Sequence, residues 1–273
     1  MLYGVGVVKD DADVLEQSIR HAVTFCDRVF YIDNDSSDDS WAIIEALASE
    51  MPAKVVAYER IAQPFVEGLR SRIVNEVSDD LGAGTWWLKL DADEFLDSDP
   101  RPSIRAAERK GADGILAWSA QFALTDLDVR DWEAGRDDRS RPISQRRRHF
   151  LVDWREVRLW RNQPGIPWVD ESREFPPWVT KLTTTGLFNR HYPYRDPVQA
   201  QQRIELRRGN PAFSHVDFED WRSVVRPASK YHLYNEGSPF RVDWPQFVRN
   251  KVRVKARQAV SHLRSSTIHE QPL

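Results

Sequence analysis

The sequence has a single cysteine, Cys26, and therefore no internal disulfide framework. It also has no apolar run approaching the roughly 20 residues that an α-helix needs to span a bilayer. The first eight residues carry no basic stretch of the kind that begins a signal peptide, and they predict a strand instead. The formal net charge of −3 gives no overall electrostatic case for binding nucleic acid. We therefore expect a cytoplasmic protein without nucleic-acid partners.

Two glycine-rich phosphate-binding patterns are also missing. Gly4 and Gly6 lack the third glycine of the dinucleotide motif, and no phosphate loop ends in Gly-Lys-Ser or Gly-Lys-Thr. This argues against an NAD enzyme and against a P-loop enzyme. Tryptophan, by contrast, is plentiful, with 11 residues. Many of these must belong to the core, but a surplus suits stacking on bases or sugars.

Strands and helices alternate through the first part of the chain. Short apolar runs predict buried strands, and helical spacing of apolar residues predicts helices between them. The predicted strands are 2–8, 28–32, 54–58 and 86–90, and the predicted helices are 13–26, 41–51 and 66–77. Such alternation is typical of an α/β fold with a mostly parallel sheet and helices on both faces.

Three carboxylates follow the strand 86–90 within four residues: Asp91, Asp93 and Glu94. Like charges that close to one another disfavour ionisation together. A divalent cation resolves that conflict, and oxygen ligands favour Mg²⁺ or Mn²⁺. The alternative interpretation is a solvated turn after a strand, since an Asp-x-Asp pattern is common by itself.

A second polar cluster, residues 33–39, follows the strand 28–32. Ligands of open α/β sheets bind at the carboxyl ends of the strands, so the two clusters predict a nucleotide crevice. A metal beside such a crevice suggests a ligand that contains a diphosphate. The cation would neutralise the charge that develops on the diphosphate when it is the leaving group. Two reactions fit: transfer of the group attached to the diphosphate, or transfer of a phosphoryl or nucleotidyl group.

The second half of the sequence has a different character. A strand is predicted at 114–122 and a polar helix at 197–208. Between them, residues 126–149 are dense in charge, which indicates either an exposed loop or a mobile lid over an acceptor. A helix near 245–263 carries alternating basic residues, which predict a solvated helix or, as a minority interpretation, contact with an anionic membrane surface.

Several segments together resemble the inverting glycosyltransferases of family 2, which have the GT-A fold. The chain from Val7 to Leu15 is similar to the first strand and helix of that family. The turn from Asp33 to Asp38 resembles its nucleotide-binding turn, and Asp91-Ala92-Asp93-Glu94-Phe95 its Asp-x-Asp region. The weaker similarities are those of Arg72 with Asn75, Arg158–Arg161, Trp168–Glu171 and Arg190–Arg195.

The resemblance implies a role for each matching residue. Asp93 would hold Mn²⁺ or Mg²⁺, Asp91 would bind the metal through water or the ribose, and His191 would be a further metal ligand or a buried structural histidine. The base and ribose of the nucleotide would contact Asp33, Asn34 and Asp35, and Arg72 would pair with a phosphate or the base. Glu171 would be the general base that takes a proton from the acceptor hydroxyl. Asp170 stands where the family often has histidine, so the base stays open between Asp170 and Glu171.

The resemblance also implies a domain organisation. We expect a GT-A domain at 1–210, with a nucleotide-binding half (1–113) and an acceptor half (114–210), followed by a helical C-terminal extension (211–273). The expected substrates are a UDP- or GDP-type nucleotide sugar and a glycan, lipid-linked or small-molecule acceptor. The expected location is cytoplasmic, and under the minority interpretation of the basic helix the enzyme would lie at the inner face of a membrane.

Two other functions remain open at the level of the sequence. A nucleotidyltransferase acting on a sugar phosphate would share the sheet and the acidic site. It ranks second because residues 9–11, Lys-Asp-Asp, are acidic and glycine-free, unlike a triphosphate-binding loop. A catalytically inactive nucleotide- or glycan-binding protein is the third, because Asp35 replaces the usual glycine and Asp170 the usual histidine.

Overall fold

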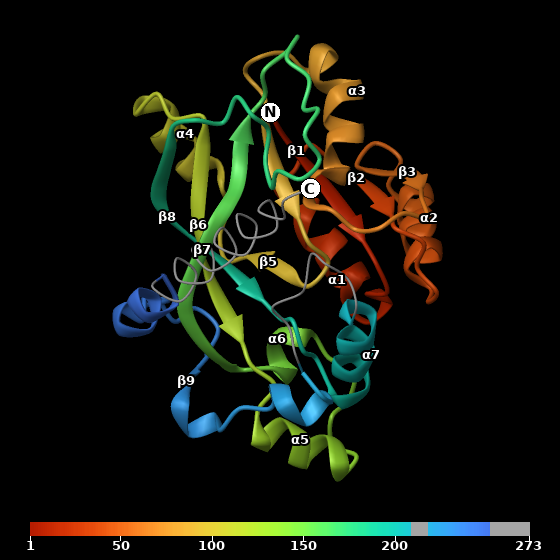
Figure 1. Ribbon diagram of the computed structural model, residues 1–273, viewed down its shortest axis with the longest axis vertical. Coiled ribbons are helices and arrows are strands. Elements are labelled where there is room, and N and C mark those ends of the chain that lie inside the picture. The colour runs from red at the N-terminus through yellow and green to blue at the C-terminus, as the bar shows by residue number, and fades with distance from the viewer. Residues whose placement is uncertain (209–217, 252–273) are drawn as a thin grey trace, which may run out of the picture.

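The computed structural model describes residues 1–208 and 218–251 (Figure 1). Their strands form one nine-stranded sheet in the order β3-β2-β1-β4-β7-β6-β8-β5, with β9 paired to β7. The strands are β1 (Leu2–Val8), β2 (Arg28–Asp33), β3 (Val55–Arg60), β4 (Trp86–Leu90), β5 (Glu94–Leu96), β6 (Gly114–Phe122), β7 (His149–Arg161), β8 (Leu182–His191) and β9 (His232–Leu233). The helices are α1 (Ala12–Ala22), α2 (Ser40–Glu50), α3 (Ser71–Leu81), α4 (Arg101–Arg109), α5 (Asp126–Glu133), α6 (Ile143–Arg146) and α7 (Pro197–Arg207), and the 3₁₀ helices are η1 (Glu67–Arg70), η3 (Trp221–Val224) and η4 (Ala228–Lys230).

The sheet is parallel from β3 through β2 and β1 to β4. It then changes direction, because β7 is antiparallel to both β4 and β6, while β8 runs parallel to β6. In Figure 1 the parallel strands β1, β2 and β3 are on the right, and β6, β7 and β8 are on the left. The predicted α/β class and the four predicted strands of the first half are confirmed. The second half adds the antiparallel pairs that the sequence did not predict.

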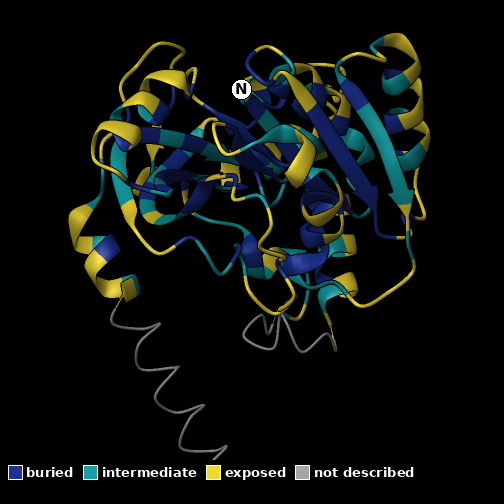
Figure 2. Cartoon of the chain, turned by 90° about the horizontal axis from the view of Figure 1, so that it is seen from above, coloured by how far each residue is buried: buried dark blue, intermediate teal, exposed yellow. Residues whose placement is uncertain are grey.

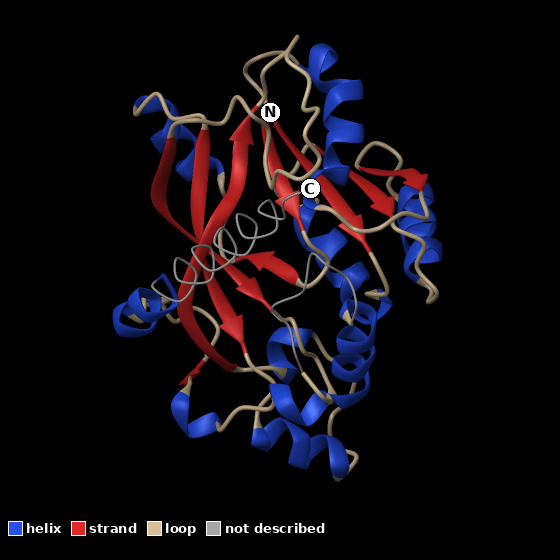
Figure 3. Cartoon of the chain, viewed as in Figure 1, coloured by secondary structure: helices blue, strands red, loops and turns tan. Residues whose placement is uncertain are grey.

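Each parallel strand sends alternate side chains into two separate cores, as the period of two of a strand requires. In β4, Trp86, Leu88 and Leu90 belong to one core, whereas Trp87 belongs to the other. Helices α1, α2 and α4 cover the first core, and α3 covers the second. Figure 3 shows these helices around the strands, and Figure 2 shows that the central strands are buried while the outer sides of the helices are exposed.

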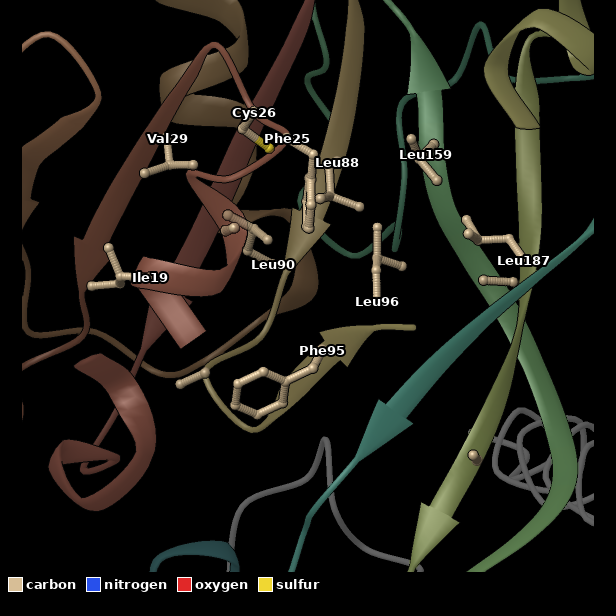
Figure 4. Close-up of a cluster of buried hydrophobic side chains, with 14 of the residues drawn as sticks. Ile19, Phe25, Cys26, Val29, Leu88, Leu90, Phe95, Leu96, Leu159 and Leu187 are labelled. Carbon is tan, nitrogen blue, oxygen red and sulfur yellow. The ribbon is translucent and has the colours of Figure 1, made fainter. Parts of the chain in front are cut away.

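The short strand β5 links the two halves of the chain. It follows the Asp91–Asp93 turn directly and pairs antiparallel with β8, so that Glu94 lies opposite His191. The first core is continuous across this junction. Figure 4 shows side chains from β4, β5, β7 and β8 in one cluster: Leu88, Leu90, Phe95, Leu96, Leu159 and Leu187. Fully burying one such side chain stabilises the fold by about 1.5–3 kcal/mol.

The charge-dense segment 126–149 is neither a long irregular loop nor a fully exposed one. It contains α5 and α6, and α5 begins with a capping box in which Thr125 and Asp128 bond each other's backbone. Arg146 and Arg147 are buried and both pair with Asp137. Arg146 and Arg147 can therefore be buried because Asp137 neutralises them, while most other charged residues of the segment are exposed.

The C-terminal extension is only partly helical over its described residues. Residues 218–243 form η3, η4, β9 and irregular chain, and residues 244–251 are helical. Most of the predicted basic helix lies outside the described residues, and so does the hypothesis of membrane contact that depends on it. Over residues 1–208 and 218–251, we find no helix with the length and hydrophobicity required to cross a membrane.

Candidate functional site

A cavity of about 970 Å³ is located at the carboxyl ends of β1, β2 and β4. Because β1 lies between β2 and β4 in parallel register, the turns after these strands come together at one edge of the sheet. Lys9, Asn34, Asp35, Asp91 and Asp93 from these turns all line the cavity. The two polar clusters found in the sequence thus meet as expected.

The turn after β2 is held by a buried carboxylate. Asp33 is fully buried, and its Oδ1 accepts a hydrogen bond of 2.9 Å from the backbone N–H of Ser36. Arg60 Nε lies 3.3 Å from the same oxygen. Asp35, which stands where the similar family has glycine, adopts a left-handed conformation with φ = 59°. Asp33 therefore shapes the turn, while Asn34 and Asp35 line the cavity.

Asp91 is bound by two buried arginines. Arg70 donates to Oδ1, and Arg158 Nη1 donates to Oδ2 at 2.6 Å. Burial raises the pKa of Asp91, but Arg70, Arg158 and Lys89 outweigh it and hold the pKa below the usual range. Both carboxylate oxygens already have cationic partners, so Asp91 is poorly placed to bind a metal directly.

Asp93, Glu94 and His191 form the group whose composition fits a metal ion. One potential ligand atom from each lies within 4.8 Å of the others. This follows from the register of β5 and β8, which puts Glu94 opposite His191. Asp93 Oδ2 is buried and has no hydrogen-bond partner among the described residues. Two carboxylates and an imidazole are suitable ligands for Mn²⁺.

The group combines carboxylates with nearby cations, because Arg158 pairs with Glu94 and Arg203 Nη1 lies 2.9 Å from Asp93 Oδ2. Burial raises the pKa of Glu94 well above its usual value, and the neighbouring carboxylates Asp91 and Asp93 add to the effect. Burial likewise raises the pKa of Asp93, but Arg203 and His191 oppose it and hold the pKa well below the usual range. The Asp93 carboxylate is therefore ionised at neutral pH, and a metal ion bound to Oδ2 would replace the contact with Arg203.

Helix α7 adds two arginines to the cavity. Arg195, which is fully buried, ties the start of this segment to the turn after β1, with Nη2 2.7 Å from Asp11 Oδ1 and 2.7 Å from Asp13 Oδ1. This placement brings Arg203 Nη1 to 2.9 Å from Asp93 Oδ2.

Arg207, one turn further along α7, also lines the cavity. Burial and then repulsion from Arg203 lower the pKa of Arg207 to about 10, which is the environment expected of an anion-binding pair.

Arg72 does not line the cavity. Its guanidinium forms a two-point interaction with Glu59 on the outside of α3, at 2.8 Å to each carboxylate oxygen. The arginine that faces the Asp-x-Asp turn is Arg70, two residues earlier, because η1 rather than α3 carries it inward. Sequence spacing alone could not distinguish the two, since the 3₁₀ turn changes the direction of the side chain.

The structure does not bring Asp170 and Glu171 into the cavity either. Asp170 is exposed, and its Oδ1 accepts from the backbone N–H and hydroxyl of Ser172. The carbonyl of Glu171 accepts a 3.0 Å bond from Gly68 N–H, and a side chain at Gly68 would collide with this backbone. The segment is thus held against η1 by its main chain.

Further side chains of the site come from β7, and all but Arg158 were missed in the sequence. Asp153, Trp154, Glu156 and Arg158 of this strand all line the cavity. Glu156 Oε2 accepts a 3.0 Å bond from Lys89, a buried residue of β4. Asp153, Trp154 and Glu156 belong to no motif, and their presence in the site follows from pairing between strands that are distant in sequence.

No protein-family model matches this sequence, and no curated protein matches it significantly. Among solved structures, a mannosyltransferase from Pyrobaculum calidifontis in complex with GDP-Man and Mn²⁺ has a TM-score of 0.44 and 11% identity. That match covers 76% of this chain and 60% of the mannosyltransferase, so this chain spans less than two thirds of that protein.

Two further solved structures are less similar. A protein from Bacillus anthracis described as a glucose-1-phosphate thymidylyltransferase, in complex with sucrose, has a TM-score of 0.38 and 10% identity, with 83% of this chain and 100% of that chain covered. A mannose-1-phosphate geranyltransferase from Thermus thermophilus has a TM-score of 0.28 and 11% identity over 45% and 42% of the two chains. All three are named as transferases, but these scores assign neither a family nor an activity to this chain.

Proposed function

We propose that this chain is a metal-dependent, inverting glycosyltransferase that uses a nucleotide sugar as donor. One observation carries the proposal. The carboxylates and imidazole of Asp93, Glu94 and His191 lie in the same cavity as a pair of arginines, Arg203 and Arg207, at the carboxyl ends of the parallel strands. A divalent cation and arginines side by side are the partners that a diphosphate requires.

The parts of the donor would be distributed over the cavity as follows. The base and ribose would lie against Asn34 and Asp35 in the turn after β2. The diphosphate would lie between the Asp93 group and Arg203, with Lys9 nearby. The cation, held by Asp93, Glu94 and His191, would neutralise charge on the diphosphate as it leaves. Asp91, bound to Arg70 and Arg158, would position the turn.

The size of the cavity fits a ligand as large as a nucleotide sugar. Pockets for one drug-sized ligand are on the order of 300–1,000 Å³. The volume of about 970 Å³ is at the upper end of that range. A nucleotide sugar at the strand ends would leave the wall formed by β7 for an acceptor. We propose the GT-A assignment and the division into donor and acceptor halves because the first half supplies the strand-end turns of the cavity and the second half supplies the wall formed by β7.

A thermal-shift screen with UDP, GDP and their sugar conjugates, each with Mn²⁺ or with EDTA, tests the proposal. A ligand that binds the native state alone raises the melting temperature. We expect at least one nucleotide to do so in Mn²⁺ and not in EDTA, and the corresponding nucleotide sugar to release nucleoside diphosphate. The proposal fails if no nucleotide sugar is turned over. If pyrophosphate appears instead from a nucleoside triphosphate and a sugar phosphate, the enzyme is a nucleotidyltransferase.

A further inference from the structure

Strand β7 contains an irregularity where it borders the cavity. Ser119 of β6 pairs with Trp154, while the next residue, Ala120, pairs with Val152. Asp153 therefore has no partner on β6 and forms a β-bulge. In a regular strand Asp153 and Trp154 would point to opposite faces, but here both line the cavity. Bulges often redirect side chains in this way beside active sites.

Asp153 differs from the other carboxylates of the cavity in its partners. Its Oδ2 accepts a hydrogen bond of 3.0 Å from the neutral amide of Asn250. Every other acidic residue that lines the cavity has an arginine, lysine or histidine within 4.0 Å: Asp11, Asp35, Glu67, Asp91, Asp93, Glu94 and Glu156. Within residues 1–208 and 218–251, Asp153 has no such ion pair.

This difference matters for proton transfer. A cation beside a carboxylate stabilises its ionised form and makes it a weaker base. Glu156 illustrates the effect: although burial raises its pKa, Arg158 and Lys89 lower it to about 2. Burial raises the pKa of Asp153 above its usual value, and Asp243 adds to the increase. A raised pKa brings a carboxylate closer to the range in which a general base works best.

Trp154 supplies a second element beside this carboxylate. Trp154 is 37% exposed, whereas its neighbours in the sheet Trp118 and Trp160 are buried. An indole offers an apolar face to the C–H side of a sugar ring, while adjacent carboxylates accept bonds from the hydroxyls. Asp153 is the adjacent carboxylate, whereas both oxygens of Glu156 already accept bonds from Lys89 and Arg158. This part of the cavity suits a carbohydrate better than an aliphatic chain.

We propose that Asp153 is the catalytic base of the transfer and that Trp154 is the platform on which a sugar acceptor lies. This inference rests on the proposed function. The proton of the acceptor hydroxyl moves to the Asp153 carboxylate as its oxygen bonds to the anomeric carbon of the donor. The bond from that carbon to the diphosphate oxygen breaks, and the electron pair leaves with the nucleoside diphosphate. Asp153 takes the role that the sequence suggested for Asp170 or Glu171.

The test compares hydroxyl acceptors with azide, a nucleophile that has no proton to lose. The donor is the nucleotide sugar that wild-type enzyme turns over, and the acceptors are a panel of methyl glycosides. In Asp153→Asn we expect transfer to the glycosides to fall by about 10²–10⁴-fold. Sodium azide should restore nucleoside diphosphate release and yield the glycosyl azide. Undiminished transfer in Asp153→Asn, or azide rescue of Glu171→Gln instead, would overturn the assignment.

Two controls separate catalysis from folding. Asp131→Asn makes the same substitution at an exposed carboxylate on α5 that does not line the cavity, and it should keep wild-type transfer. Donor affinity and melting temperature should be unchanged in Asp153→Asn.

Trp154→Ala should raise the acceptor KM about tenfold with kcat little changed, and Trp154→Phe should recover most of the loss. If Trp154→Ala weakened donor binding as much as acceptor binding, Trp154 would not be a specific platform for the acceptor. If wild-type enzyme turns over no nucleotide sugar, the proposed function fails, and the base assignment fails with it.

Discussion

Asp91 and Asp93 are two residues apart and yet meet different neighbours. Both oxygens of Asp91 are bound by buried arginines, whereas Asp93 Oδ2 has a charge nearby but no well-oriented hydrogen bond. In a regular strand two residues this far apart would share a face, but β4 ends at Leu90 and the turn that follows sends the two side chains toward different elements. Asp91 faces β7 and η1, and Asp93 faces β8 and α7.

This contrast predicts opposite phenotypes for the two asparagine variants. Asp91→Asn leaves Arg70 and Arg158 without their full counter-charge, and we expect a loss of about 3–5 kcal/mol in the free energy of unfolding. Asp93→Asn should remain folded but lose the Mn²⁺-dependent rise in melting temperature and nearly all transfer. Urea unfolding and thermal shifts with and without Mn²⁺ measure both effects. Near-wild-type turnover in Asp93→Asn would contradict the metal site.

At the scale of elements, α7 acts as the cationic wall of the cavity. Arg203 and Arg207 are one turn apart on it, so both point to the same side. We expect Arg203→Met to weaken the binding of nucleoside diphosphate by about tenfold or more, because a charge-assisted hydrogen bond contributes about 1.5–3 kcal/mol. Isothermal titration at two salt concentrations measures the change. The matched control is Arg208→Met, which removes an exposed arginine next to Arg207, and an equal loss there would indicate a general charge effect.

The segment around α6 gives a prediction about acid stability. Burial raises the pKa of Asp137, but its bonds to Arg146 and Arg147 outweigh this and lower the pKa to about 2. Because the folded pKa lies below the unfolded value of about 3.9, the pair stabilises the fold above pH 4. That stabilisation, about 2 kcal/mol, is lost as the pH falls from about 4 toward 2.

Asp137→Asn should therefore be less stable than wild type at pH 7 by about this amount. The difference in the free energy of unfolding between the two proteins should shrink as the pH falls below 4. The wild-type carboxyl is then protonated, first in the unfolded state and at lower pH in the folded state, so that it resembles the neutral amide of the variant. Urea unfolding at pH 7, 5 and 3 follows it. A difference that stays constant between pH 7 and pH 3 would show that the ion pairs are not its source.

For the whole molecule, the sequence predicts the parallel half of the fold well. The strands β1 to β4 are short apolar runs bounded by polar turns, and local composition is enough to find them. The boundary of α3 is less accurate: residues 66–70 were expected to be helical, but the α-helix begins at Ser71 after a 3₁₀ turn. The antiparallel half was harder to predict because its strands pair across large sequence separations.

The sequence likewise predicted only part of the site, namely the residues that directly follow predicted strands. Asn34, Asp35, Asp91 and Asp93 follow predicted strands, and the structure brings them to one cavity with His191. Arg70 depends on a 3₁₀ turn, and Asp153 depends on a β-bulge, neither of which composition reveals. Arg203 reaches the site only because Arg195 ties the start of α7 to Asp11 and Asp13. These positions required the three-dimensional structure.

The two halves of the sheet are interlocked rather than simply adjoining. β4 of the first half pairs with β7, and β5, which also comes from the first half, pairs with β8 on the far edge. The largest core spans both, with Leu88 and Leu90 in contact with the cluster that contains Leu159 and Leu187. Removing the second half would expose this core and leave β4 as an unpaired, apolar edge.

We therefore expect the full chain to unfold in a single cooperative transition and the fragment 1–113 to fail to fold alone. Circular dichroism melts and the dispersion of amide signals in NMR spectra measure both outcomes. Co-expression of 1–113 with 114–273 is the control, because it restores the β4–β7 and β5–β8 pairs without the covalent link. A cooperative melt of 1–113 by itself would mean that the nucleotide-binding half is stable without the strands that complete its sheet.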